Sequence, residues 1–210
     1  MKELFISELD DRLQKQVRSA REALEKGGVD YVVQVCGELL KHQPGAYEVR
    51  GILWKALYSE IQASSGVPWF KNKSSSLQFK LSTRSLLKKD PLALMLKCDE
   101  QLRGKQLFSE LFISMGKAAE ALGWTESRVF ACQALSELKP DHVAPRLALA
   151  QVLMEVGRPQ PAIESLEWIL SKEPSNANAQ TLLKNASVAE TLQRGNWEDT
   201  DTSFHSKKHS

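Results

Sequence analysis

Three cysteines, Cys36, Cys98 and Cys132, carry the most reactive side chains in the sequence. A thiol can act as a nucleophile, a redox centre or a metal ligand, but these three lie far apart and form no Cys-x-x-Cys pair. Each occupies the same position of an internal repeat, where a further copy of the repeat has Leu166. Because Cys behaves as a small buried hydrophobe at such positions, we expect all three to pack in the core.

Histidines and carboxylates add neither a catalytic group nor a metal site. His205 and His209 have the i, i+4 spacing of metal ligands on a helix, but they lie in a polar tail where we expect no stable helix. Asp10 and Asp11 lie near a terminus, with no predicted pocket around them. The sequence contains no G-x-S-x-G, no Gly-rich phosphate loop and no H-E-x-x-H. These observations argue against an enzyme, and they predict no cofactor and no metal.

A regular spacing of glycine and proline organises the elements that would position any site. The two residues recur as pairs at one separation, which are Gly27 and Pro44, Gly123 and Pro140, and Gly157 and Pro174. The last two pairs are offset by 34 residues, and copies of this frame begin at Leu13, Ser75, Ser109 and Val143. The eighth position of the frame is always small: Ala20, Ser82, Gly116 and Ala150. A small residue lets two helices approach, Gly ends the first helix with a positive φ, and Pro ends the second. Each copy is therefore predicted to be a helical hairpin.

The period, the small eighth residue, the Gly turn and the terminal Pro resemble the tetratricopeptide repeat (TPR). The clearest copy spans residues 143–176, with Leu149 and Ala150 at its central positions. Residues 182–199 resemble the ending of a group of poorly characterised bacterial TPR proteins. The resemblance implies a cytosolic bacterial protein of stacked hairpins, and it implies no known activity.

We therefore predict an all-α, TPR-like solenoid of antiparallel helix hairpins, a single array over residues 1–194. Hairpins are expected at about 13–46, 75–108, 109–142 and 143–176, with a lone helix at 47–63 and a cap helix at 177–194. We expect the turn-rich residues near 64–74 to form an irregular loop step, and residues 195–210 to form a disordered tail.

Composition and charge indicate which cellular compartment and which classes of partner to expect. The N-terminus lacks the long apolar run of a signal peptide, and no run approaches the roughly 18 apolar residues of a membrane span. Since an odd number of unpaired cysteines also fits a reducing compartment, we expect a cytoplasmic protein. With 28 basic and 26 acidic side chains, the net charge of +2 argues against a dedicated nucleic-acid binder.

The TPR resemblance implies where a partner would bind. In that family the first helix of each hairpin lines a concave groove, and the corresponding positions here hold mainly cationic or polar side chains. The predicted groove residues are Arg18, Arg21, Lys80, Thr83, Ser114, Lys117 and Gln151. Such a groove suits an acidic segment or a C-terminal peptide of another protein. An ordinary solvated face is the alternative, because glutamates occupy other inward positions: Glu25, Glu110, Glu120 and Glu155.

The predicted function is that of an adaptor or assembly scaffold, which binds a peptide or a partner helix in this groove. Self-association is one alternative, since the apolar edges of such arrays can pair with a second copy. The other alternative is RNA or an acidic partner on the basic band from Lys71 to Lys105, which holds nine Lys or Arg and three Asp or Glu residues. The aromatic in that band, Phe79, stands in a core position, which favours a solvated helix face over base stacking.

Trp69 and Phe70 form an aromatic tip in the predicted loop step, directly after Pro68. Two large aromatic side chains either fold back over the first hairpin or anchor a partner. The variant Trp69→Ala separates these hypotheses. A lower melting temperature would indicate the fold-back, and lost association at unchanged stability would indicate the anchor.

Overall fold

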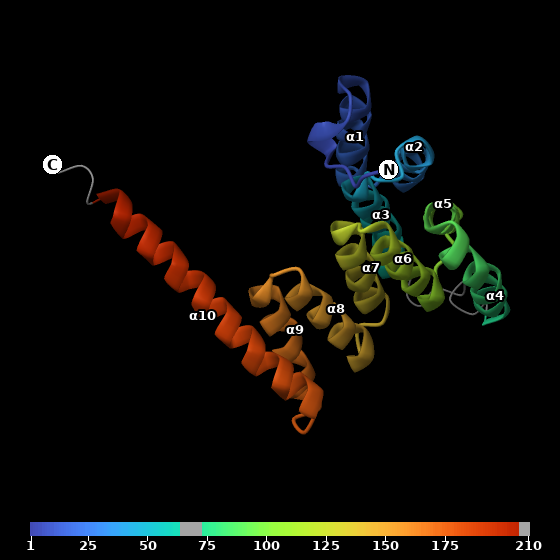
Figure 1. The fold of residues 1–210 in the computed structure, drawn as a ribbon. Coiled ribbons are helices and arrows are strands. Elements are labelled where there is room, and N and C mark those ends of the chain that lie inside the picture. The colour runs from blue at the N-terminus through green and yellow to red at the C-terminus, as the bar shows by residue number, and fades with distance from the viewer. Residues whose placement is uncertain (64–72, 206–210) are drawn as a thin grey trace. The chain divides into compact units, whose positions relative to one another are not determined.

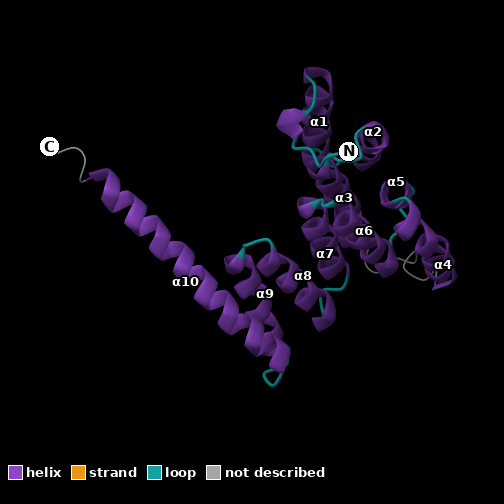
Figure 2. Cartoon of the chain, in the orientation of Figure 1, coloured by secondary structure: helices purple, strands orange, loops and turns teal. Residues whose placement is uncertain are grey.

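The computed structural model describes residues 1–63 and 73–205, and within these ranges it contains ten α-helices and no β-strand. Most helices that follow one another along the chain pack together. Figure 2 shows these helices with the loops of the described residues in teal. The all-α prediction is therefore confirmed. The chain divides into two compact units, Met1–Leu138 and Lys139–Ser210. The single array expected over residues 1–194 stays a prediction.

The first unit contains a short 3-10 helix and seven of the α-helices (Figure 1). They are η1 (Ile6–Glu8), α1 (Asp11–Glu25), α2 (Val29–His42), α3 (Tyr47–Ala63), α4 (Lys73–Lys89), α5 (Pro91–Arg103), α6 (Ser109–Leu122) and α7 (Thr125–Leu138). The first three predicted hairpins correspond to α1–α2, α4–α5 and α6–α7, and the lone helix corresponds to α3. Most of the predicted loop step at 64–74 lies outside the described residues, and α4 already begins at Lys73.

Local signals explain where these helices begin and end. Asp90 caps α5, because its carboxylate accepts a hydrogen bond from the backbone N–H of Ala93 at 2.9 Å. Pro91 follows at the first position of α5, where its missing N–H is not needed. The turns after α1 and α6 contain Gly27 and Gly123, whose φ angles of 74° and 69° lie in a region that L side chains rarely adopt. The positive φ predicted at these glycines is confirmed.

The core of the first unit lies along the seams between its helices. Its larger members include Trp54 from α3 and Phe112 from α6, whose ring centroids lie 4.9 Å apart in an edge-to-face arrangement. Met95 of α5 and Leu53 of α3 are completely buried in the same cluster. Removal of such apolar surface from water stabilises the fold by about 25 cal/mol per Å².

The N-terminal residues join two distant parts of the first unit. The N–H of Leu4 donates to the carbonyl of Gly45 at 2.8 Å, in the turn before α3. The Glu3 carboxylate accepts hydrogen bonds from the backbone N–H groups of Glu126 and Ser127, at 2.9 and 2.6 Å. These N–H groups belong to the first turn of α7, which has no helical acceptors for them and favours a negative charge. Glu3 therefore caps a helix that lies at the other end of this unit's sequence.

The second unit consists of α8 (Val143–Glu155), α9 (Pro159–Lys172) and α10 (Ala177–His205). The helices α8 and α9 form the fourth predicted hairpin, and α10 packs mainly on α9. Ala150, Ala162 and Leu166 are completely buried in this unit. Asn176 caps α10, because its side-chain oxygen accepts a hydrogen bond from the N–H of Ala179 at 3.0 Å.

Helix α10 differs from the sequence-based prediction at its C-terminal end. The cap helix was expected to end at residue 194 and to be followed by a disordered tail, but α10 continues to His205. An ion pair between Glu190 and Arg194 has the i, i+4 spacing that supports a helix near this point. The expectation of disorder rested on the low helix propensity of Asn, Asp and Thr. The cost of such residues in a helix is small, so interactions with neighbouring residues can override it. In the parts of the chain that the structure describes, no helix has the length and the apolar character to cross a bilayer.

Candidate functional site

Four of the seven predicted groove residues line a single hollow in the first unit. The hollow has a volume of about 200 Å³ and lies between α4, α5 and α6. Its lining residues are Lys80, Thr83, Arg84, Leu87, Leu94, Glu110, Ser114 and Lys117. We call this the α4–α6 groove, because these two helices supply every lining residue except Leu94.

Helical periodicity explains why these side chains converge. Lys80, Arg84 and Leu87 lie four and three residues apart on α4, so they share one face of the helix. Residues 110, 114 and 117 repeat that spacing on α6. Phe79 anchors α4 from a neighbouring face, since it is 6% exposed and its ring lies 5.2 Å from that of Phe108. The packing of α4 on α6 then brings the two polar faces together.

The groove carries an excess of positive charge. Lys80, Arg84 and Lys117 are exposed cations, and Glu110 is the single carboxylate among the lining residues. The Lys80 ammonium lies 3.8 Å from the Glu110 carboxylate, a long contact for an ion pair, and the lysine side chain is 65% exposed. An ion pair in such water-rich surroundings contributes little to stability. The local excess therefore remains positive, and carboxylates of a partner would meet it.

The floor of the groove is formed by short polar and apolar side chains. Thr83 and Ser114 are 4% and 5% exposed, and the Thr83 hydroxyl donates to the carbonyl of Lys80 at 3.2 Å. Leu94 is buried beneath them, and Leu87 is half-buried. Hydroxyl groups and cations can bind a carboxylate. Neither Cys nor His lines the groove.

The three remaining predicted groove residues lie elsewhere. Arg18 and Arg21 are exposed on α1, and Arg21 is 3.3 Å from the carboxylate of Glu48. Gln151 is exposed on α8, in the second unit. Sequence reasoning did not include Arg84, although its position four residues after Lys80 could have indicated a shared face.

The predicted aromatic tip falls outside the described residues. Trp69 and Phe70 belong to the segment 64–72, so the fold-back and the partner anchor both stay as predictions.

Larger hollows have less distinctive chemistry. One of about 660 Å³ lies between α1 and α2, and its lining includes Asp10 and Glu38 as well as Arg12 and His42. Another, of about 300 Å³, lies between α2 and α5 and also has side chains of both signs. Opposite charges are mixed along both surfaces, whereas three cations and one carboxylate line the α4–α6 groove.

The cysteines mostly occupy the core, as predicted. Cys36 and Cys98 have no exposed surface, whereas Cys132 is half-buried. Burial raises the pKa of the Cys36 thiol to about 12, and burial is also the main cause that raises the pKa of Cys98. Both thiols are therefore protonated and unreactive at neutral pH. Among the described residues, no three His, Cys, Asp or Glu side chains are grouped so that they could hold a metal ion.

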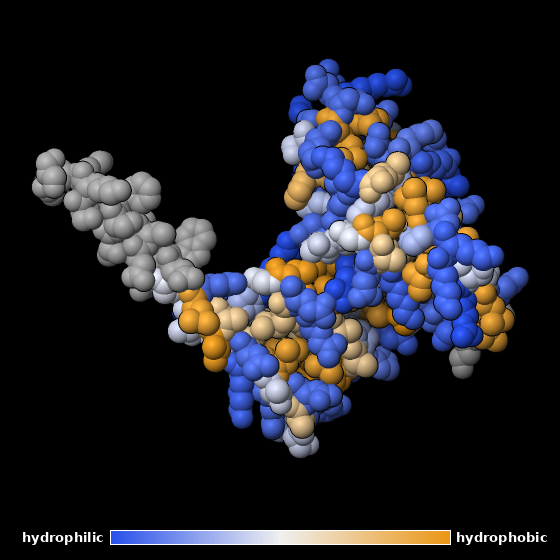
Figure 3. All heavy atoms as spheres, viewed as in Figure 1, coloured by the Kyte–Doolittle hydropathy of each residue, from blue (hydrophilic) through white to orange (hydrophobic). Residues whose placement is uncertain are grey.

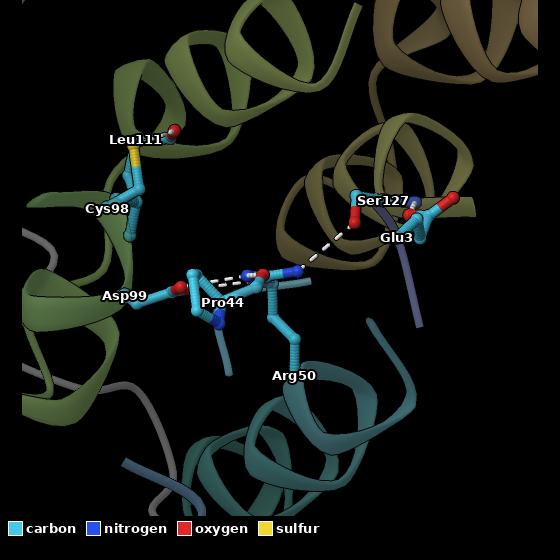
Figure 4. Close-up of polar contacts among 7 residues, drawn as sticks. All are labelled: Glu3, Pro44, Arg50, Cys98, Asp99, Leu111 and Ser127. Carbon is cyan, nitrogen blue, oxygen red and sulfur yellow. Dashed lines mark hydrogen bonds and ion pairs between the residues drawn. The ribbon is translucent and has the colours of Figure 1, made fainter. Parts of the chain in front are cut away.

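A buried ion pair in the first unit was missed by sequence reasoning. The Arg50 guanidinium, from α3, donates to both carboxylate oxygens of Asp99, on α5, at 2.7 and 2.8 Å (Figure 4). It also donates to the Ser127 hydroxyl on α7 at 3.1 Å and to the carbonyl of Pro44 at 2.7 Å. We call Arg50, Asp99, Ser127 and Pro44 the Arg50 network.

The charges of Arg50 and Asp99 stabilise each other within the Arg50 network. Burial alone would lower the pKa of Arg50, but the adjacent Asp99 carboxylate outweighs this and raises it. Burial raises the pKa of Asp99, and Arg50 opposes that rise. Since the arginine is fully buried and donates to three different groups, it joins helices and offers no charge to a ligand.

Comparison of the chain with protein-family models, with curated proteins and with solved structures finds no match.

Proposed function

We propose that this chain is a protein-binding adaptor or scaffold, which takes an acidic segment of a partner into the α4–α6 groove. The observation that carries the proposal is the convergence of Lys80, Arg84 and Lys117 around one carboxylate, Glu110. Lysine and arginine side chains form charge-assisted hydrogen bonds with carboxylates, and such pairs strengthen as a partner removes water from them. The TPR-like repeat pattern supports the proposal, because stacked hairpins present an extended, pre-organised surface.

The dimensions of the groove favour a macromolecular partner over a small molecule. Pockets that enclose drug-sized ligands have volumes of roughly 300–1,000 Å³, whereas this open groove holds about 200 Å³. A peptide or helix would contact the groove and the helix surfaces on either side of it. Affinity would then come from the sum of many contacts along the two helices.

Nucleic acid is the less favoured partner. Within the basic band, Lys105 is bound at 2.9 and 3.0 Å by the carboxylates of Asp30 and Glu60, and the Lys97 ammonium donates to the Ser82 hydroxyl. Phe79 is buried, so it offers no exposed ring for base stacking.

A charge-reversal experiment tests the proposal. The probe is a fluorescent peptide rich in Glu and Asp, with its binding followed by anisotropy. The double variant Lys80→Glu/Lys117→Glu should abolish binding, since it replaces two of the three cations by acids. The matched control is Lys15→Glu/Lys184→Glu, which reverses two exposed lysines outside the groove and changes the net charge equally. Equal binding by the two double variants would overturn the proposal.

Self-association is a second proposal, and it rests on α10. Val188 and Leu192 are 60% and 65% exposed, and their i, i+4 spacing places them on one face of the helix. Figure 3 shows hydrophobic residues on the surface of α10 just before the grey spheres begin. The substitution Leu192→Glu should dissociate a dimer in light scattering, and a wild-type chain that is monomeric at all concentrations would contradict this proposal.

A further inference from the structure

The face of α4 that borders the groove is amphipathic as well as cationic. Leu77, Lys80, Leu81 and Arg84 follow the i, i+3, i+4, i+7 spacing of a single helix face. Leu77 and Leu81 are 60% and 69% exposed, although large apolar side chains normally avoid water. The cations that line the groove therefore stand beside two uncovered leucines.

The facing helix α6 also has an exposed apolar residue next to its groove residues. Glu110, Ile113, Ser114 and Lys117 repeat the spacing of the α4 set, and Ile113 is 36% exposed. The corresponding positions of the other three copies hold Val17, Phe79 and Leu147, and this apolar pattern predicts a core residue at position 113 as well. Its exposure leaves a third apolar side chain beside the same groove.

The two helices that form the α4–α6 groove thus carry three exposed apolar side chains in addition to the three cations that line it. The apolar residues are Leu77, Leu81 and Ile113, and the cations are Lys80, Arg84 and Lys117. An extended acidic peptide or a lone C-terminal carboxylate would satisfy the cations but would leave the leucines in water. A helix can do both, because its side chains form ridges that fit between two packed helices and can carry apolar and acidic residues on adjacent stripes.

We propose that the partner of this groove is an acidic amphipathic helix. Its apolar stripe covers Leu77, Leu81 and Ile113, and acidic residues flanking that stripe pair with Lys80, Arg84 and Lys117. This inference rests on the proposed function, for which it names the partner class. The apolar contacts would bury the exposed side chains of the groove, and the charges would favour acidic helices over basic ones.

The experiment compares two peptides of one composition. The first is about 20 residues long, with Leu at the a and d positions of a heptad and Glu at the flanking positions, so that it forms an amphipathic helix. The second contains the same residues in an order that removes the helical spacing of the leucines. Both are measured by fluorescence anisotropy against the wild-type chain, against Leu77→Ser/Leu81→Ser and against Lys80→Glu/Lys117→Glu.

The wild-type chain should bind the amphipathic peptide at least about tenfold more tightly than the permuted one, which corresponds to about 1.4 kcal/mol. The serine variant should lose that preference and keep the weaker binding that both peptides share. The charge-reversed variant should bind neither peptide. If the two peptides bind with equal affinity and the serine substitutions do not change it, the proposal of an amphipathic helix is wrong. The proposal that the groove binds an acidic segment would then still hold. Failure of both peptides to bind would overturn both proposals.

A melting curve of the serine variant tests another occupant of the groove. If a segment of the chain itself covers Leu77 and Leu81, Leu77→Ser/Leu81→Ser should lower the melting temperature by several degrees, and the partner-helix proposal would fail. We expect only the small decrease that the lower helix propensity of Ser causes, because both side chains are already exposed to water.

Discussion

Two of the ion pairs in the first unit, Arg50–Asp99 and Lys80–Glu110, have opposite roles because their surroundings differ. In the Arg50 network the guanidinium is fully buried and donates to Asp99, Ser127 and Pro44. In the α4–α6 groove Lys80 is 65% exposed, and its carboxylate neighbour lies 3.8 Å away. A buried charge whose donors are engaged fixes the arrangement of helices, whereas an exposed surplus of one sign is available to a partner.

A buried ion pair can define the arrangement of helices without adding to the stability of the fold. The Arg50 network joins α3, α5, α7 and the turn before α3, so it defines how these elements fit together (Figure 4). Taking two charges out of water is costly, and an apolar pair of similar volume can be as stable as a buried ion pair. We therefore expect that breaking the pair is far more harmful than replacing it.

The largest effect is expected from Asp99→Ala. This substitution leaves the Arg50 guanidinium buried without its carboxylate, so the free energy of unfolding in urea should fall by about 3–5 kcal/mol. The double variant Arg50→Met/Asp99→Leu should be less destabilised than the single one. A loss below about 1 kcal/mol for Asp99→Ala would show that the pair is not held as tightly as its 2.7 and 2.8 Å contacts indicate.

A smaller effect is expected at the helix that carries Ser127. Glu3→Ala removes the cap of α7, and the free energy of unfolding should fall by about 1–2 kcal/mol. Hydrogen exchange should be faster at the N–H groups of Glu126 and Ser127 than in the wild-type chain. The matched control is Lys2→Ala, whose side chain is 73% exposed and pairs with Glu8. Equal stability of the two variants would contradict the capping role of Glu3.

The stability of the protein should depend on pH through the buried Cys36 thiol. Burial raises the pKa of Cys36 to about 12, compared with about 8.5 for a thiol in an unfolded chain. Stability from the protonated thiol is complete below about pH 8.5 and is lost as the pH rises toward 12, because only the unfolded state releases the proton. The expected loss is about 0.7 kcal/mol between pH 8 and 9. Cys36→Ala should show a shallower decline over this range, and an identical decline in both proteins would contradict the prediction.

The smallest effect on stability is expected in the groove. Lys80→Glu/Lys117→Glu should change the free energy of unfolding by less than about 0.5 kcal/mol, because exposed ion pairs contribute little. The same variant should no longer bind acidic peptides. A large loss of stability would mean that the groove charges hold the fold together, and the contrast with the Arg50 network would disappear.

Short-range signals in the sequence account for most helix boundaries. Gly27 and Gly123 permit the positive φ of the turns that end α1 and α6, and the Asp90–Pro91 step starts α5. The helix predicted at 47–63 appears as α3 with the same bounds. These features depend on residues a few positions apart, so they can be read without the rest of the fold. The TPR resemblance, and not a local signal, implied four of the side chains that line the α4–α6 groove, which are Lys80, Thr83, Ser114 and Lys117.

Contacts between residues distant in the sequence could not be predicted in this way. Arg50 lies in an apolar helix, and it is buried there because Asp99 and Ser127 reach it from two other helices. The Glu3 cap on α7 has no local signal either. Ile113 occupies an apolar repeat column and is nevertheless 36% exposed.

The helices and their turns could be predicted from the sequence, because backbone preferences and helical periodicity act over a few residues. Which charges are buried and which remain exposed could be seen only once the helices were packed together. A side chain's burial depends on what packs across from it, and in the first unit those neighbours come from helices far apart in the chain. The same dependence separates Arg50, which is fully buried, from Lys80 and Lys117.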